Sequence, residues 1–416
     1  MQRFYKHEES LDSSVKKRLG IIYTPQPVAQ EVVRLAFEAY TEKAPPRILD
    51  LGCGTGVFLQ EIHAQWKWDE NPNLYVKGCD IDSEAVSIAV QNGFNAINKS
   101  FFDLDEKFDI IVGNPPYVRI QNLDEKTRKQ VSKLPCISGD TDLYLAAIEW
   151  SLRNADIVSM ITPSSWISNN SARKLRDFVS ENQLLYYVKD FGEEQLFKNV
   201  STYVAISTFK KCSSYTIIRN EERVEKSYPQ KDLFYEKRSG TPLLDVCDIR
   251  IGLATLADGI FFNDIQFAES VPCVKASKTT ISRGWIIYPY KDGKPIPEDD
   301  LSEEVHDYLC THYDRLLSRS DTGPEWYTYG RTQGFSNFSP KVLIPPAQKD
   351  IHGVLLEDDV CYYISGYAAF PKEISLLDLY NIFQSKELHE FVLERGKPMS
   401  GGYRGINKSL LAQFTV

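Results

Sequence analysis

The most distinctive chemical feature of the sequence is Asn-Pro-Pro-Tyr, residues 114–117, which directly follows a β-branched apolar run. That run predicts a buried strand ending at a stiff turn, because Pro115 and Pro116 cannot continue a strand ladder. The side-chain oxygen of Asn114 and the carbonyl of Pro115 could accept both N–H groups of an exocyclic amine on an aromatic ring. Tyr117 could stack on that ring. Such a turn would localise the lone pair of a weakly nucleophilic amine and so prepare it for group transfer.

A glycine loop, Asp-Leu-Gly-Cys-Gly-Thr-Gly, follows another predicted strand and opens a predicted helix. Its three glycines would let the backbone approach a ligand closely: Gly52, Gly54 and Gly56. The spacing is Gly-x-Gly-x-Gly, so the loop lacks the last glycine of the dinucleotide-binding pattern Gly-x-Gly-x-x-Gly. Asp80 ends the next predicted strand, where a carboxylate can bind ribose hydroxyls. A tight turn without a ligand is the alternative interpretation of the loop on its own.

The ligand that suits this loop carries a ribose and an amino acid but no pyrophosphate. Asp50, just before the loop, could bind a cationic amino group, and Asp80 could bind the ribose. S-adenosylmethionine fits this description, and NAD fits it less well. Since the methyl group of a sulfonium is already activated, positioning and hydrogen bonds would be enough for catalysis, and we expect no metal.

Strands and helices alternate from about residue 24 to residue 211. A helix is predicted after Thr24-Pro25, and strands are predicted within residues 47–51, 74–82, 94–104, 107–113, 156–163, 184–191 and 201–211. This alternation predicts an α/β fold with a doubly wound, mostly parallel, seven-stranded sheet. Ligands bind such sheets outside the carboxyl ends of the strands, so the glycine loop and the Asn-Pro-Pro-Tyr turn should face one crevice.

Beyond residue 211 the pattern becomes irregular. We expect an N-terminal extension over residues 1–20, a catalytic domain over 21–212, a linker over 213–240 and a smaller α+β domain over 241–416. The last region alternates short aromatic segments with loops rich in Gly, Pro and Asp, which indicates a second domain of mixed character.

Composition sets broad limits. The 416 residues are 42% hydrophobic and 25% charged, and the eight cysteines are widely separated. We expect reduced thiols, no secretory signal and no membrane span, hence a cytoplasmic protein. His306 and His312 lack neighbours that could complete a metal site. The net charge of −9 argues mildly against a purely electrostatic nucleic-acid binder but leaves room for a local basic cleft.

Residues 18 to about 210 resemble the amino-methyltransferases that modify DNA adenine at N6, in the gamma arrangement with the donor site before the catalytic motif. The matching segments are Gly-Ile-Ile-Tyr-Thr-Pro, the glycine loop, Cys-Asp-Ile-Asp, and the adenine-type Asn-Pro-Pro-Tyr. The resemblance implies S-adenosylmethionine as donor, with Thr24 and Pro25 packing over its methionine part. It also places Asp80 and Ile81 beside the ribose.

The resemblance further implies that the segment Glu-Gln-Leu-Phe-Lys-Asn closes over an extruded base, with Phe197 as a second aromatic contact. One departure concerns the donor adenine. The family often has Asp-Phe after the third strand, whereas this chain has Lys-Ser-Phe-Phe-Asp. Either Asp103 or Ser100, beside Phe101, would contact the adenine amine.

The family places a target-recognition domain last, which implies that residues 241–416 bind duplex DNA. The cationic candidates for contacts to phosphates or bases are Arg331, Lys341, Lys397, Arg404 and Lys408, and a solvated surface charge is the alternative for each. We expect a monomer, with a separate restriction endonuclease as a candidate partner. Asp-Glu-Lys at 124–126 and Asp-Gly-Lys at 292–294 are interpreted as a solvated helix start and a turn, so no nuclease is expected in this chain.

Two other functions compete with a DNA adenine methyltransferase. Asn-Pro-Pro-Tyr also occurs in enzymes that methylate protein glutamine, and related turns occur in RNA methyltransferases. A decayed, catalytically inactive DNA-binding module is the second alternative, although the intact Asn114 and glycine loop argue against it.

Overall fold

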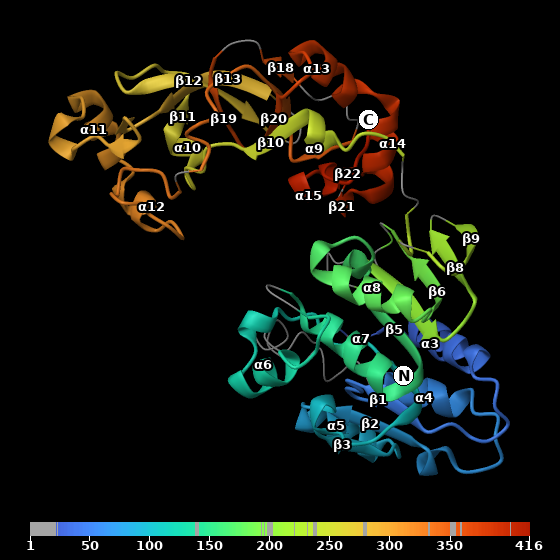
Figure 1. Ribbon diagram of the computed structural model, residues 1–416. Coiled ribbons are helices and arrows are strands. Elements are labelled where there is room, and N and C mark those ends of the chain that lie inside the picture. Colours follow the sequence, from blue (N-terminus) through green and yellow to red (C-terminus); the bar gives the residue numbers. More distant parts are fainter. Residues whose placement is uncertain are drawn as a thin grey trace. The chain divides into compact units, whose positions relative to one another are not determined.

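The computed structural model describes residues 22, 24–137, 141–192, 194, 196–197, 203–219, 221–230, 232–235, 239–277, 281–331, 333–349, 355–357, 360–399 and 401–416. The chain forms two compact units, Met1–Lys237 and Arg238–Val416, which are described separately (Figure 1). The boundary between the units lies within the predicted linker.

The N-terminal unit contains a nine-stranded sheet in the order β3-β2-β1-β4-β5-β7-β6-β8-β9. Its strands are β1 (Ile48–Leu51), β2 (Val76–Asp80), β3 (Ala96–Asn98), β4 (Phe108–Gly113), β5 (Ala155–Pro163), β6 (Leu185–Asp190), β7 (Val204–Lys210), β8 (Ser214–Arg219) and β9 (Glu222–Ser227). The strands from β3 to β5 are parallel, and β7 is antiparallel to both of its neighbours. The prediction of a doubly wound, mostly parallel α/β sheet is confirmed.

The sheet is two strands wider than predicted. Residues 213–240 were interpreted as a linker because they are polar and charged, yet β8 pairs with β6 and β9 pairs with β8. The strand β9 lies at the edge of the sheet and is almost wholly exposed, with the burial expected of a charged edge strand. A solvated edge strand has no apolar periodicity, and this is why the sequence pattern suggested a linker.

Helices cover both faces of this sheet. One face is covered by α3 (Gln26–Ala39), α4 (Val57–Ala64) and α5 (Ser83–Gln91), and the other by α7 (Leu143–Asn154) and α8 (Arg173–Glu181). Consecutive β4 residues alternate between the two cores, since Ile110 and Val112 pack with α3 while Ile111 packs with α7. A strand buried on both faces explains the unbroken apolar run before Asn114.

The short helix α6 (Glu125–Val131) lies between β4 and α7 in the sequence. Val131 packs with Leu143 and Ala146 of α7, and Phe102 contacts the same cluster. The connection to α7 is tied down by Glu149, whose fully buried carboxylate accepts a hydrogen bond from the Cys136 N–H at 3.0 Å. These contacts fix α6 against the main body of the unit.

The C-terminal unit is an α+β assembly of small sheets. Its sheets are ordered β10-β20-β16-β18, β11-β13-β12-β19, β14-β15 and β17-β22-β21. The strands are β10 (Cys247–Ile251), β11 (Phe262–Asn263), β12 (Ser270–Ala276), β13 (Ile281–Ile287), β14 (Tyr290–Lys291), β15 (Lys294–Pro295), β16 (Lys341–Ile344), β17 (Ala347–Gln348), β18 (Leu355–Glu357), β19 (Tyr362–Ile364), β20 (Tyr367–Pro371), β21 (Lys397–Met399) and β22 (Tyr403–Gly405). The helices are α9 (Leu243–Val246), α10 (Asp258–Phe261), α11 (Glu303–Cys310), α12 (Tyr313–Leu317), α13 (Leu376–Gln384), α14 (Lys386–Arg395) and α15 (Lys408–Leu411).

Two sequence expectations concern the chain as a whole. All eight cysteines are free, and six of them are buried. Among the described residues, no helix has the length and apolar character that a membrane crossing requires.

Candidate active site

The first and fourth strands bring the two predicted motifs together. The parallel register pairs Leu51 of β1 with Gly113 of β4, so Gly52 and Asn114 are the next residues along two adjacent strands. The strands approach so closely here that a Cβ on Gly113 would lie 2.3 Å from the Leu51 carbonyl oxygen. A side chain at residue 113 would therefore separate the glycine loop from the Asn-Pro-Pro-Tyr turn.

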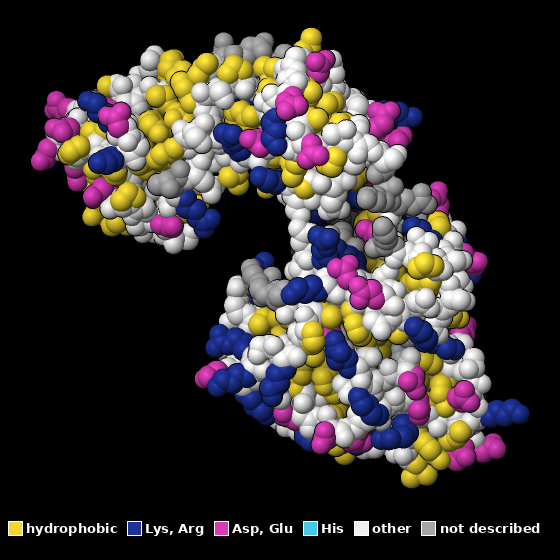
Figure 2. All heavy atoms as spheres, viewed as in Figure 1, with side chains coloured by type: hydrophobic (Ala, Val, Ile, Leu, Met, Phe, Trp, Pro, Cys, Tyr) yellow, Lys and Arg dark blue, Asp and Glu magenta, His cyan; other side chains and the backbone are white. Residues whose placement is uncertain are grey.

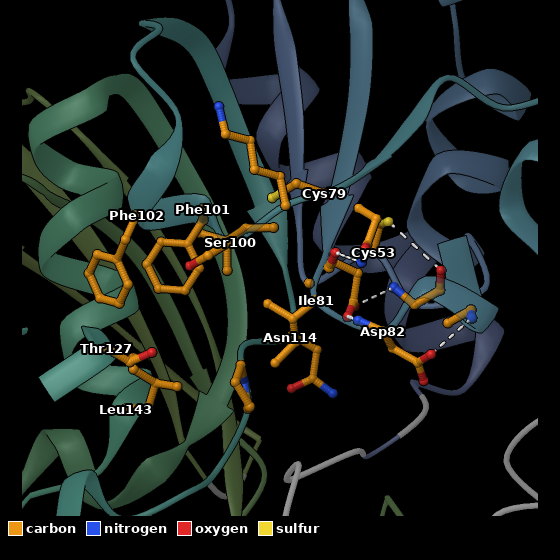
Figure 3. Close-up of a pocket in the computed structure, with 18 of the residues that line it drawn as sticks. Cys53, Cys79, Ile81, Asp82, Ser100, Phe101, Phe102, Asn114, Thr127 and Leu143 are labelled. Atoms are coloured by element: carbon orange, nitrogen blue, oxygen red, sulfur yellow. Dashed lines mark hydrogen bonds between the residues drawn. The ribbon is translucent and has the colours of Figure 1, made fainter. Parts of the chain in front are cut away.

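A cavity of about 560 Å³ opens at this edge of the sheet. In the view of Figure 3, Cys53 and Asp82 lie on one side, Phe101, Phe102 and Thr127 lie on the other, and Asn114 lies between them. Ten of the predicted site residues line it: Thr24, Gly52, Gly54, Asp80, Ile81, Ser100, Phe101, Asp103, Asn114 and Pro116. Six others do not line it: Pro25, Asp50, Gly56, Pro115, Tyr117 and Phe197.

The glycine loop is held by Asp80. The N–H of Gly54 donates to one oxygen of Asp80 at 2.9 Å, and the N–H of Asp82 donates to the other at 2.9 Å. Burial raises the pKa of Asp80, while these two donors oppose the rise. Asp82 in turn caps α5 by accepting hydrogen bonds from two backbone N–H groups. Asp80 therefore has a structural role in addition to any ligand contact.

Asp50 lies beneath the loop. It is completely buried, and neither carboxylate oxygen accepts a hydrogen bond from a described residue. Burial, and then the charge of Asp80, raises the pKa of Asp50 well above its usual value. A buried carboxylate without donors is costly, and a cationic ligand group nearby would relieve that cost.

The amide of Asn114 is oriented by the start of α3. Its Nδ2 donates to the Ile22 carbonyl oxygen at 2.9 Å and to Thr24 Oγ1 at 3.1 Å. Because both N–H groups of the amide are already donated, the side-chain oxygen is the part of Asn114 that remains available to a ligand. This Oδ1 is buried and accepts no hydrogen bond from the residues described. Pro25 contributes by starting α3, where its carbonyl accepts from Val28 and Ala29.

The predicted aromatic contacts are more deeply placed than expected. Tyr117 is partly buried, packs edge-on against Tyr144 with ring centroids 6.1 Å apart, and has a buried hydroxyl with no partner among the described residues. Burial raises the pKa of Tyr117 well above its usual value. Phe197 is buried in the core that also contains α3. Neither residue lines the cavity, so the expectation that they share one site with Asn114 differs from this structure.

The third strand leads into the other wall of the cavity. Ser100 and Phe101 line it beside Asp103, as predicted. The two oxygens of Asp103 are taken by α6, since Lys126 Nζ lies 2.7 Å from one and Gln130 Nε2 lies 2.7 Å from the other. These hydrogen bonds lower the pKa of Asp103. The Ser100 hydroxyl is the less engaged of the two alternatives.

Several lining residues were missed by the sequence analysis. They are mainly residues of α6 and its approach, with two cysteines and a phenylalanine: Cys53, Cys79, Phe102, Leu123, Asp124, Lys126, Thr127 and Gln130. Asp124 does cap a helix, as the helix-start interpretation required. The sequence did contain one indication that the α6 segment lines the cavity. This segment follows the Asn-Pro-Pro-Tyr turn by only a few residues and carries polar groups. Burial raises the pKa of Cys79 to about 12, so its thiol is a neutral part of the wall.

The predicted DNA contacts of the C-terminal unit fall into two classes. Lys341 is 0% exposed, and its Nζ donates to the Cys361 carbonyl oxygen at 2.6 Å. The prediction that Lys341 contacts DNA is wrong, because β16 is the inner strand between β20 and β18. The other candidates reach the surface: Arg331, Lys397 and Lys408 are exposed, and Arg404 is partly exposed. Lys397 and Arg404 lie on the paired strands β21 and β22.

Comparison with known proteins finds relatives of part of this chain. Residues 57–197 match the family model described as Eco57I restriction-modification methylase. The chain is 26% identical over 325 residues to the type II methyltransferase M.BstVI of Geobacillus stearothermophilus, covering 62% of this chain and 57% of that protein. It is 39% identical over 104 residues to the release factor glutamine methyltransferase of Aliivibrio fischeri, covering 23% of this chain and 34% of that protein. The chain thus spans little more than half the length of M.BstVI.

The fold agrees with these sequence matches. The structure of the type IIL restriction-modification enzyme MmeI, solved in complex with DNA, superposes with a TM-score of 0.69 at 14% identity, covering 97% of this chain and 69% of that one. At this identity the likeness concerns the fold. This fold is consistent with the match of residues 57–197 to the family model described as Eco57I restriction-modification methylase.

Proposed function

We propose that this protein is a site-specific DNA methyltransferase that transfers a methyl group from S-adenosylmethionine to the N6 amine of an adenine flipped out of duplex DNA. The observation that carries the proposal is the orientation of Asn114. Its Nδ2 is held by Ile22 and Thr24, while its buried Oδ1 accepts no hydrogen bond from the described residues at the cavity wall. An amide fixed in this way offers an acceptor to an incoming amine.

The cavity residues suit the donor. Asp50 would meet the cationic amino group of the methionine part, since its buried carboxylate accepts no hydrogen bond from described residues. Asp80, at the end of β2, and Ile81, which is 63% exposed, would meet the ribose and adenine. S-adenosylmethionine supplies an activated methyl group when bound. The chain itself supplies orientation, the acceptors for the target N–H groups and a partly dehydrated wall.

The target would be bound at the Asn-Pro-Pro-Tyr turn. Asn114 Oδ1 and the Pro115 carbonyl would accept the two amine N–H groups, and Pro116 would shape the cavity wall. Tyr117 and Phe197, which do not line the cavity in this structure, would contact the base in the DNA complex. Extruding a base requires a few kcal/mol, which contacts to the duplex must offset.

The C-terminal unit would hold that duplex. Its exposed cations Arg331, Lys397 and Lys408 could bind phosphates or base edges, together with Arg404. We propose that the protein acts as the modification enzyme of a restriction-modification system, with any nuclease supplied by a separate protein.

The test is transfer of labelled methyl groups from S-adenosylmethionine to duplex DNA, RNA and protein in parallel, followed by hydrolysis of the product. N6-methyladenine in duplex DNA is the expected product. N4-methylcytosine would keep the DNA substrate but overturn the base assignment, and label found only in RNA or on a protein glutamine would overturn the proposal. Binding of DNA with no transfer to any acceptor would identify an inactive recognition module.

The glutamine alternative is favoured by one observation, the 39% identity to a release factor glutamine methyltransferase over 104 residues. A glutamine side chain also ends in an amide nitrogen with two N–H groups, which the same acceptors could hold. The matched region covers 23% of this chain, which is too short to span the C-terminal unit. That unit is the reason for preferring DNA.

A further inference from the structure

The segment containing α6 is a local positive region on an acidic protein. Between Arg119 and Lys133 the chain carries five cationic side chains against two carboxylates, whereas the whole chain has a net charge of −9. Figure 2 shows lysine and arginine side chains gathered over the part of the N-terminal unit where Figure 1 labels α6. Since surface charges of one sign concentrate potential locally, this region should attract a polyanion.

The helix α6 presents two sides. Lys126, Thr127 and Gln130 line the cavity, and Lys126 is engaged with Asp103. Arg128 and Lys133 are exposed, and neither has a carboxylate partner among the residues described. Lys129 pairs with Glu125 at 2.7 Å, but both side chains are 73% exposed, so that pair contributes little.

The position of α6 is fixed rather than loosely tethered. Its last residue, Val131, is buried against Leu143 and Ala146. The connection that follows is anchored by the buried Glu149, which accepts from the Cys136 N–H and from Arg153. The exposed cations of this segment are therefore held in place beside the cavity. Such preorganisation lowers the entropy cost of binding an anion there.

We propose that Arg128 and Lys133 of the α6 segment bind backbone phosphates of the DNA strand whose base enters the cavity. This inference rests on the proposed function, because it takes the polyanion to be duplex DNA. Exposed cations neutralise the phosphates of a DNA strand, and Arg128 can hold a phosphate in bidentate fashion. The N-terminal unit would thereby grip the target nucleotide on both sides, at the base and at the backbone.

The experiment measures the salt dependence of binding to a short fluorescein-labelled duplex of mixed sequence. The full chain is compared with the Arg128→Ala/Lys133→Ala variant, and each lost phosphate contact should reduce the slope of log Kd against log salt by about 0.9. We expect the slope to fall by about 1.8 and low-salt affinity to fall about tenfold or more. The matched control is Lys43→Ala/Lys67→Ala, since these exposed lysines flank the amino-terminal edge of the sheet, and its slope should not change.

Two further measurements keep the outcomes distinct. S-adenosylmethionine affinity should be unchanged in the double variant, and the charge-conserving Arg128→Lys/Lys133→Arg variant should restore most of the slope. A wild-type slope in Arg128→Ala/Lys133→Ala, or an equal loss in the lysine control, would overturn the inference while leaving methyl transfer by the wild-type chain intact. Binding of RNA more tightly than duplex DNA through the same residues would overturn it as well. DNA binding with the expected change in slope but no methyl transfer would support the phosphate contacts of Arg128 and Lys133 and refute the proposed function.

Discussion

Asn114 and Thr24 are joined by a hydrogen bond of 3.1 Å from the asparagine Nδ2 to the threonine Oγ1, although 90 positions separate them in the chain. Thr24 is 2% exposed and directly precedes Pro25, the N-cap of α3. The bond therefore couples the Asn-Pro-Pro-Tyr turn after β4 to the segment that leads into α3. It explains in physical terms why a threonine belongs in front of the proline at residue 25.

Replacing Thr24 by valine should lower kcat about tenfold while changing donor affinity much less. Valine keeps the shape but removes the acceptor, so one of the two bonds that orient the Asn114 amide is lost, at a cost of about 1.4 kcal/mol in the transition state. Steady-state kinetics and calorimetric titration of S-adenosylmethionine measure the two quantities. Thr24→Ser retains the hydroxyl and should stay near wild type; a serine variant as slow as the valine variant would show that packing matters and the hydrogen bond does not.

Asn114→Ala should reduce methyl transfer by at least about a hundredfold and leave donor binding largely intact. The variant removes the acceptor that polarises the target amine, and losses of this size follow removal of one such group. Asn114→Asp is the informative companion, because it keeps an acceptor but loses the Nδ2 donor to Ile22 and Thr24. Equal losses of donor affinity and turnover in the alanine variant would mean that Asn114 binds the donor instead.

Asp50→Asn should raise the stability of the ligand-free protein and weaken donor binding. The folded protein holds a proton on Asp50 more tightly than the unfolded chain does, because burial raises its pKa. Ionised Asp50 therefore destabilises the fold at pH values above its unfolded pKa of about 4, by about 1.4 kcal/mol for each unit of the shift. The amide avoids this cost.

Thermal unfolding of wild type and Asp50→Asn at pH values from about 5 to about 8 measures the sign of the stability difference between them. The variant's advantage should grow as the pH rises until wild-type Asp50 is fully ionised. Donor affinity of the wild type should fall as the pH drops and Asp50 takes up a proton. Asp50→Asn less stable than wild type at neutral pH would refute this account.

The glycine loop, Asp80 and Asn114 could be predicted because each follows a strong strand pattern, and a parallel sheet must bring its carboxyl ends to one edge. Leu51 and Gly113 pair as that rule requires. The same rule gave no information about α6, whose charged sequence suggested a solvated helix start. Its Lys126 and Gln130 reach Asp103 only through tertiary packing.

Lys341 shows the limit of charge as a predictor. A lysine in a predicted recognition domain suggests a phosphate contact, but its neighbours Val342, Leu343 and Ile344 are equally buried, and the strand they form is an inner one. A lysine followed by a short apolar run has the same sequence pattern in an edge strand as in an inner strand of a sheet. Strand order, which decides between the two, depends on long-range pairing that a local pattern does not contain.

Tyr117→Phe should stabilise the protein by roughly 1 kcal/mol. The Tyr117 hydroxyl is buried without a hydrogen-bond partner among the described residues, and leaving such a group unpaired typically costs 1–3 kcal/mol. Chemical denaturation measures the difference. Tyr117→Ala should instead weaken the contact to the flipped base more than it weakens donor binding, and a 2-aminopurine probe at the target position should report this. Lower stability of the phenylalanine variant would reveal a hydroxyl partner.

Asp103 is expected to act on α6 and not on the donor, since its two oxygens receive Lys126 and Gln130 at 2.7 Å. Asp103→Ala should therefore change S-adenosylmethionine affinity less than about threefold, because exposed ion pairs contribute little. Ser100→Ala, which removes the less engaged group on the same wall, should have the larger effect. In a double-mutant cycle, Asp103→Ala and Lys126→Ala should not be additive, because each removes the same contact. Additive losses, or a loss in Asp103→Ala that exceeds the loss in Ser100→Ala, would show that the carboxylate leaves α6 and binds the donor adenine directly.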